Sequence, residues 1–343
     1  MADSDSVSHL YLDVDVTAFL RDAEYFMPFC KGYTAVAARL TPTLRYRINN
    51  RATVRGGVLL TALAGSDNRC RLEPVIAFDY SPWPWLTLTV GTLRGSLHHQ
   101  LGEPMYSNER WVYAYKEDGL QLVTLTRHWE SDTWLNWEHF LKPWTPDQER
   151  FTLGTRHRFT LLGSADDAWR LTVPMAFIGC HRGGQFSTLD TCIETLFNES
   201  VGLGASYQGS LVGFDLNLPL YLFQNASPRG ERYTPFENGW GLYPQAGLHF
   251  NLRRLRLGFD CGYWHASRYI APRGSYLFQS VSWHDASFAM TDRRMLTLAL
   301  NLSHSYKGLR LDINAQCYYD IQLRKTDFVF GLVVAWDEKF KLL

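Results

Sequence analysis

The sequence predicts an all-β protein, a transmembrane up-and-down antiparallel β-barrel of about sixteen strands, with fourteen or eighteen left open. Three observations support this fold. Long stretches alternate between apolar and polar residues, short and long connections alternate along the chain, and aromatic residues make up 15% of the 343 residues, with 12 Trp and 18 Tyr. Alternating strands, short turns at one end and aromatic girdles are typical of bacterial outer-membrane barrels.

The first strand-forming stretch, residues 10–21, shows the alternation most clearly. Its even positions, from Leu10 to Leu20, are all apolar, whereas its odd positions carry aromatic, hydroxyl and charged side chains such as Asp13, Asp15 and Arg21. Successive side chains of a strand point to opposite faces, so one face can meet lipid and the other a lumen. Twelve residues at about 3.3 Å each span roughly 40 Å, which is enough for a tilted strand to cross a bilayer. A long strand of a soluble sandwich is the alternative for this stretch alone.

The same pattern continues to the end of the chain. The turn at Asn49-Asn50 has the chemistry that positive φ angles require. Further predicted strands are 36–48, 54–62, 71–80, 86–90, 119–129, 133–137, 151–162, 168–180, 197–208, 212–222, 240–251, 255–263, 296–302, 309–319 and 328–336. The segments near 94–118 and 267–293 lose the alternation and are predicted to be long external loops of a single barrel domain spanning 1–343. A sandwich would place long connections at both ends.

Composition and the chain ends narrow the class of protein and its location. Lys plus Arg equals Asp plus Glu at 34 each, which gives no support for a nucleic-acid partner. No run of 18 apolar residues exists, so a transmembrane helix is excluded. The first six residues lack the features of a signal peptide, so we expect a mature bacterial outer-membrane chain to which Met1 was added.

The six cysteines show no metal-site spacing, and neither a metal nor a cofactor is expected. Cys180 and Cys192 flank one predicted loop, and Cys30 and Cys70 lie at two others. Either pair could form a disulfide in an oxidising compartment, and free thiols are equally compatible with the sequence.

The predicted register sends a surplus of arginines into the lumen. Arginines that line a pore favour anions, although many of them can instead pair with inward acids and stiffen the wall. On the second strand we expect Arg45 and Arg47 to meet Asp13 and Asp15, which leaves Arg39 to face solute. The predicted lumen-lining residues are Arg21, Arg39, Arg45, Arg47, Arg55, Arg71, Arg156, Arg158, Arg170, Arg254, Arg256, Asp13, Asp15, Glu73, Asp79, Asp215 and Asp260.

The chain also resembles outer-membrane β-barrel proteins of the Bacteroidetes type. The resemblance implies an architecture and a location and leaves the substrate open. It rests on Asp13-Val14-Asp15, Glu24-Tyr25-Phe26, Gly32-Tyr33-Thr34, Pro42, Asn136-Trp137-Glu138, Gly262-Tyr263-Trp264 and Ala271-Pro272-Arg273-Gly274.

Catalytic constellations are weak in this sequence. Ser303 and His304 are adjacent and His98-His99 form a loop pair, but neither comes with a nucleophile elbow or an acid at readable spacing. Gly183-Gly184 does not precede a helix, which argues against a phosphate cradle. His284-Asp285 offers too few ligands for a metal. The sequence therefore predicts a protein that is not an enzyme.

The leading hypothesis is a porin-like barrel for passive diffusion of small polar, possibly anionic, solutes, with one long loop folded inward as a constriction. Barrels of 16 to 18 strands leave an aqueous channel. A second hypothesis is a closed structural or assembly barrel that docks a periplasmic or surface partner. A third is a lipid-modifying barrel enzyme that uses Ser303 and His304. The expected partners are outer-membrane lipid, small solutes, and a second copy or a periplasmic protein.

Overall fold

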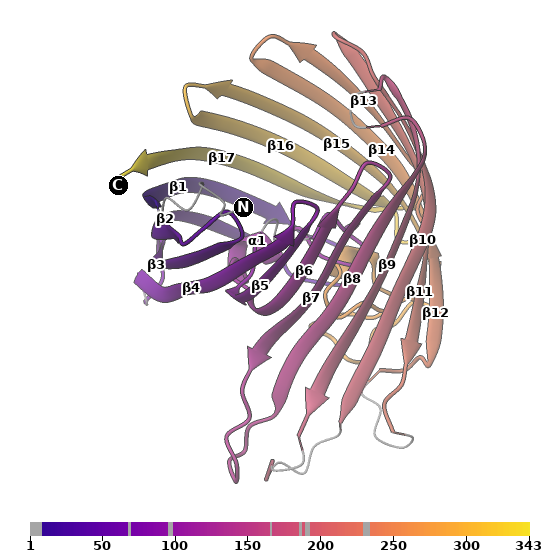
Figure 1. Ribbon diagram of the computed structural model, residues 1–343. Helices are drawn as coiled ribbons and strands as arrows, with labels where there is room; N and C mark the ends of the chain where they lie inside the picture. The colour runs from indigo at the N-terminus through magenta and orange to yellow at the C-terminus, as the bar shows by residue number, and fades with distance from the viewer. Residues whose placement is uncertain are drawn as a thin grey trace.

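The protein forms one closed antiparallel barrel, seen in a computed structural model (Figure 1). The structure describes residues 9–67, 70–94, 99–164, 167–184, 187–188, 193–228 and 234–343. Neighbouring strands pair in sequence order, and the last strand pairs back onto the first over Tyr11–Glu24, which closes the sheet. Because β17 pairs with β1, neither the first nor the last strand is a free edge of the sheet.

The described residues form seventeen strands that occupy sixteen positions around the barrel, because two short strands share one position. This agrees with the predicted number of about sixteen. β12 and β13 both lie between β11 and β14 and are separated at Tyr243-Pro244. The strands are β1 (His9–Glu24), β2 (Tyr33–Arg47), β3 (Ala52–Leu63), β4 (Cys70–Trp83), β5 (Leu86–Thr92), β6 (Asp118–Leu125), β7 (Trp129–His139), β8 (Glu149–Leu162), β9 (Trp169–Gly183), β10 (Glu194–Gln208), β11 (Val212–Asn225), β12 (Asn238–Leu242), β13 (Gln245–Leu252), β14 (Leu255–Ser267), β15 (Asp292–Tyr306), β16 (Leu309–Asp320) and β17 (Lys325–Lys341).

Alternation along the strands sorts side chains between the outer face and the interior. On β2, Val36, Leu40 and Leu44 are exposed on the outside, whereas Ala35 and Ala37, on either side of Val36, are buried inside. An apolar outer face suits lipid, and the two-residue period of a strand fixes the register once that face is chosen.

The two ends of the barrel differ in their connections. One end carries short turns, such as Lys307-Gly308, where both residues have positive φ (47° and 78°). The other end carries most of the longer connections. Short turns lie at the periplasmic end of outer-membrane barrels and long loops at the extracellular end, so β1 runs from the periplasmic to the extracellular side.

The wall is low at β5 and β6, which have 7 and 8 residues against 14 in β4. Pairing between β4 and β5 ends at Ala77 with Gly91, so the upper part of β4 has no β5 neighbour. The connection from β5 to β6 therefore starts deep within the barrel.

The described parts of both long connections, residues 93–94 and 99–117 of the first and residues 268–291 of the second, fold into the barrel and pack together. We call their described residues the plug; it contains α1 (Arg110–Tyr113) and the 3-10 turn η1 (Tyr276–Phe278). Tyr106, Tyr269 and Phe278 are fully buried within one apolar cluster. The expectation of external loops with one inward constriction is therefore corrected, because both segments carry large apolar side chains that need a core.

Two further features complete the fold. No helix among the described residues is long and apolar enough to cross a membrane. The described cysteines Cys30, Cys70, Cys180, Cys261 and Cys317 are free thiols, and the proposed partner of Cys180, Cys192, lies outside the described residues.

Candidate functional site

Hydrogen bonds between its two segments hold the plug in one conformation. The Tyr269 hydroxyl donates to the Pro104 carbonyl (3.2 Å), and the Ser275 amide donates to the Glu103 carbonyl (3.0 Å). The Ser107 amide donates to the carbonyl of Arg273 (2.6 Å). The plug thereby brings polar residues from two distant loops against the inner face of β1 and its neighbours.

A buried polar cluster forms where the plug meets the extracellular end of β1. Arg21 points inward from β1, and its guanidinium lies 3.6 Å from the Glu109 carboxylate; both side chains are 8% exposed. The Tyr25 hydroxyl donates to the same carboxylate. We give the name Arg21 cluster to six residues: Arg21, Tyr25, Tyr33, Glu103, Glu109 and Tyr318.

Two donors of this cluster, which belong to the neighbouring side chains of Arg21 and Tyr33, donate to no carboxylate or carbonyl among the described residues. They are the buried Nε of Arg21 and the buried hydroxyl of Tyr33, which follows the loop after β1. Buried polar groups are nearly always paired in proteins, so an orphan donor is costly unless it serves a ligand or a reacting group. Two of them beside two carboxylates make the Arg21 cluster the candidate site.

Glu103 supplies the group of this cluster whose charge changes near neutral pH. The Tyr318 hydroxyl on β16 lies 3.0 Å from one oxygen of the Glu103 carboxylate and 3.1 Å from the other. Burial raises the pKa of Glu103 to about 7, against the opposing field of Arg21. A carboxyl group with this pKa can accept and return a proton at neutral pH, as a general base must.

A second polar group anchors the plug near β6 and β7. The His99 ring lies between the carboxylates of Asp132 (2.7 Å) and Glu117 (2.8 Å) and stacks on Trp134 at 3.6 Å. Burial lowers the pKa of His99, but the two carboxylates raise it further and leave it above its ordinary value. Both ring nitrogens are engaged, so this histidine holds the plug; its neighbour His98 lies outside the described residues.

The predicted pairing of the first two strands is half right. Arg45 donates Nε and Nη2 to the two oxygens of Asp13, at 2.6 and 3.0 Å, as predicted. Arg47 instead donates to Asn50 in the adjoining turn (2.7 Å), because the strand ends there. Asp15 faces Asp337 across the β1–β17 pair rather than an arginine of β2.

Arg39 does not face open solute, contrary to expectation. It is 3% exposed, its guanidinium lies over the rings of Phe19, Trp111 and Tyr115 at 4.2 to 5.1 Å, and it donates to the Val112 carbonyl. The plug covers it, and this contact could not be seen from the strand pattern.

The structure places nearly all the predicted lumen residues on the inner face, with one exception. Arg254 lies in the turn before β14 and stacks on Tyr306, a residue whose register points outward, so its predicted place in the lumen is wrong. The strand begins at Leu255, as the alternation predicts, so Arg254 belongs to the turn before it. On the inner face lie Arg21, Arg39, Arg45, Arg47, Arg55, Arg71, Arg156, Arg158, Arg170, Arg256, Asp13, Asp15, Glu73, Asp79, Asp215 and Asp260.

Ser303 and His304 do not form a catalytic pair. Ser303 points inward and donates to Asp312 (2.6 Å), whereas His304, the next residue of β15, points outward. Adjacent strand residues face opposite sides, so the two cannot meet. The sequence reasoning instead missed Glu103 and Glu109, whose only signal was the polar content of a long loop, while Tyr25 lay in the Glu24-Tyr25-Phe26 motif.

Comparison with known proteins agrees with this architecture and identifies the family. A family profile described as Lipid A 3'-O-deacylase-type matches residues 2–343. The chain belongs to this family. The resemblance to outer-membrane barrels is thereby confirmed at the family level, and the prediction of a protein that is not an enzyme is wrong, because the family is one of enzymes.

Solved outer-membrane proteins share the fold at very low sequence identity. OprD of Pseudomonas aeruginosa matches at a TM-score of 0.54 with 9% identity, covering 99% of this chain and 96% of its own. OccAB4 of Acinetobacter baumannii matches at 0.54 with 11% identity, covering 99% and 100%. OmpT of Vibrio cholerae matches at 0.53 with 8% identity, covering 98% and 100%. No curated protein matches this chain. The protein is thus a bacterial outer-membrane barrel with a porin-like architecture.

Proposed function

We propose that the protein hydrolyses an ester-linked acyl chain of outer-leaflet lipid A, with the Arg21 cluster as its active site. The observation that carries the site is the pair of orphan donors, Arg21 Nε and the Tyr33 hydroxyl, beside the Glu103 and Glu109 carboxylates. The reaction class follows from the family to which the whole chain belongs.

The position of the cluster suits a lipid substrate. Arg21 lies three residues before the extracellular end of β1, which is about 10 Å at the rise of a strand. The cluster therefore lies inside the barrel near its extracellular rim, over which an acyl chain of the outer leaflet would have to enter. Phe26, next to Tyr25, is 58% exposed at the rim, where it can contact an acyl chain.

The chemistry proposed for the cluster needs one base and one donor to an oxyanion. Glu103 takes a proton from water as the water oxygen bonds to the ester carbonyl carbon. Arg21 stabilises the oxyanion of the tetrahedral intermediate. The intermediate then expels the alcohol oxygen, which receives the proton from Glu103, so the products are a fatty acid and the deacylated lipid. A preorganised donor of this kind contributes about 10²–10³ in rate.

The folded-in plug weighs against passive diffusion as the main role. A porin keeps an aqueous path, whereas here two long segments pack into one apolar cluster inside the barrel. The polar residues that remain in the lumen are used below for a different inference.

The test is mass spectrometry of lipid A incubated with the purified barrel in detergent micelles. We expect loss of one ester-linked acyl chain, at least a hundredfold slower with Glu103→Gln and about as much slower with Arg21→Met. The matched control is Glu73→Gln, an inward acid outside the cluster that pairs with Arg71 at 2.9 Å and should leave the rate unchanged. Heat-modifiable migration in gels confirms folding. An unmodified lipid with the folded wild type, or equal rates for Glu103→Gln and Glu73→Gln, contradicts the proposal.

A further inference from the structure

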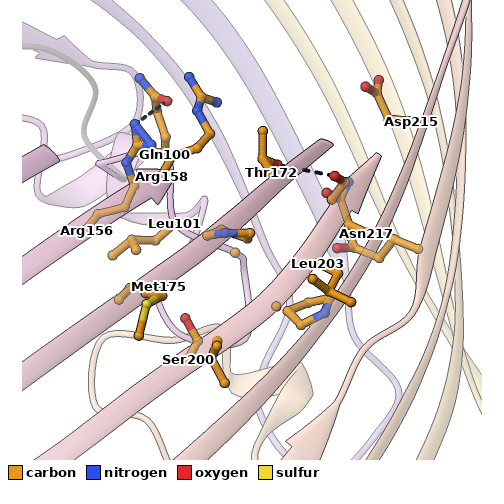
Figure 2. A pocket seen from close by; sticks show the side chains of 18 of the residues that line it. Gln100, Leu101, Arg156, Arg158, Thr172, Met175, Ser200, Leu203, Asp215 and Asn217 are labelled. Carbon is orange, nitrogen blue, oxygen red and sulfur yellow. Dashed lines mark hydrogen bonds between the residues drawn. The ribbon is translucent and has the colours of Figure 1, made fainter. Parts of the chain in front are cut away.

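A pocket lies inside the barrel on the periplasmic side of the plug (Figure 2). It has a volume of about 370 Å³ and is bounded by β8, β9, β10, β11 and β13 and by plug residues 100–102. The pocket is separate from the Arg21 cluster: the two share no residue.

The pocket exists because the wall carries no long side chains at its centre. Gly202 and Gly204 occupy successive inward positions of β10, and Pro174 and Pro219 face them from the neighbouring strands. A Cβ on Gly204 would lie 2.7 Å from the Thr172 hydroxyl and 3.0 Å from the Asn217 side-chain oxygen, so a larger residue would crowd both polar side chains of the pocket. The hollow is therefore built into the sequence of the strands.

Three arginines line one side of the hollow, and their charge is only partly balanced. Arg156 and Arg158 share the single carboxylate of Glu130. Arg170, on the next strand, has no ion pair within the described part of the chain. At this side the three arginines therefore outnumber the two nearby acids, Glu130 and Asp132, and Asp132 is also engaged by His99.

Arg156 is held in place from the plug and keeps one donor unused. Its side chain is 9% exposed, and Nη2 donates to the Gln100 side chain (2.9 Å), as Figure 2 shows. Its buried Nε has no partner among the described residues. A fixed guanidinium with an unused donor is suited to bind an anion with little loss of entropy.

The remaining polar groups of the pocket are suited to a hydroxylated molecule. Thr172 and Asn217 supply a hydroxyl and an amide across from the arginines. Asp215, the acid that also lines the pocket, is hydrogen-bonded by His249 and so is already engaged.

We propose that this pocket binds the phosphate group of a small soluble molecule, such as a sugar phosphate, that enters from the periplasm. A phosphate monoester is a dianion near neutral pH with three acceptor oxygens, which suits a wall of three guanidinium groups better than a carboxylate does. The strands separate the pocket from lipid, and Arg170 lies at the periplasmic end of β9, so the ligand comes from water.

The experiment is isothermal titration of the barrel in lipid-free detergent micelles with glucose 6-phosphate, with inorganic phosphate and glucose titrated in parallel. We expect saturable binding of glucose 6-phosphate and weaker binding of inorganic phosphate, with no binding of glucose. Arg170→Met should weaken binding at least tenfold; because Arg170 forms no ion pair, folding should be preserved. Arg156→Met should act in the same direction. The control is Arg310→Met, an inward arginine outside the pocket that has its own acid, Asp312, at 2.8 Å.

Three results would overturn the proposal. The first is no binding of either phosphate by the folded wild type. The second is equal weakening by Arg170→Met and Arg310→Met. The third is a barrel that binds no soluble phosphate in detergent but binds phosphatidic acid in nanodiscs, which would assign the phosphate to a lipid. Loss of acyl hydrolysis in Glu103→Gln with phosphate binding intact keeps this inference distinct from the proposed function.

Discussion

Arg293 on β15 is the strongest tether between the plug and the wall. Its guanidinium and its partner Asp320 are both 0% exposed; Nη2 lies 3.0 Å from the Asp320 carboxylate and 3.0 Å from the Leu277 carbonyl. Nη1 donates to the carbonyl of Gln279, and the guanidinium lies over the Phe29 ring at 3.5 Å. The second segment of the plug thus depends on one arginine for two carbonyl contacts.

Replacing Arg293 by methionine removes these contacts and leaves Asp320 buried without its cation. Breaking a buried pair from one side costs about 3–5 kcal/mol. The neighbouring Arg294 makes a matched control: it is 50% exposed, pairs with Asp292 at 3.1 Å, and a surface pair contributes less than about 1 kcal/mol.

The assay is urea unfolding in lipid vesicles, followed by tryptophan fluorescence, together with limited proteolysis of the plug. We expect Arg293→Met to lower the free energy of unfolding by about 3–5 kcal/mol and to expose the 268–291 segment to protease. Arg294→Met should change neither the free energy of unfolding nor the rate of proteolysis by much. The double variant Arg293→Met/Asp320→Asn should recover part of the loss, because no unpaired charge remains and the asparagine oxygen can still accept from the Gln322 and Leu323 amides. Equal effects of Arg293→Met and Arg294→Met would refute the reasoning.

Three further predictions concern the wall and the other plug anchor. Arg45→Ala should lower the free energy of unfolding by about 1–2 kcal/mol, because it leaves Asp13 without its bidentate partner, and an Arg45→Ala/Asp13→Ala double variant should lose no more in urea unfolding. Gly241→Ala should cost at least about 1–3 kcal/mol in the same assay, since a Cβ would lie 2.0 Å from the buried Trp264 ring; a stable variant would show that the ring can move. The pKa of His99 is raised on folding, so its stabilisation is full below its unfolded pKa near 6.5 and is lost as pH rises through the folded value. Proteolysis of the plug should therefore increase as the pH rises through the folded pKa of His99, and a pH profile unchanged by His99→Gln would contradict this.

The sequence alone determined the barrel. The period of two along nearly every strand requires one apolar and one polar face, and a one-residue slip would turn every side chain to the wrong side. This is why the inward register of Arg45 and Asp13, and their pairing across neighbouring strands, could be predicted. The same local rule places Ser303 and His304 on opposite faces.

Only the tertiary structure decided the interior. The two long segments carry no period, and although their large apolar side chains need a core, the sequence does not say which surface supplies it. Their path depends on packing between residues far apart in the chain, such as Glu109 with Arg21 and Glu103 with Tyr318. The same packing covers Arg39 and gives Glu103 its raised pKa, because burial and charge are properties of the assembled interior. Alternation fixes which face of a strand a residue occupies, whereas long-range packing fixes what that face meets.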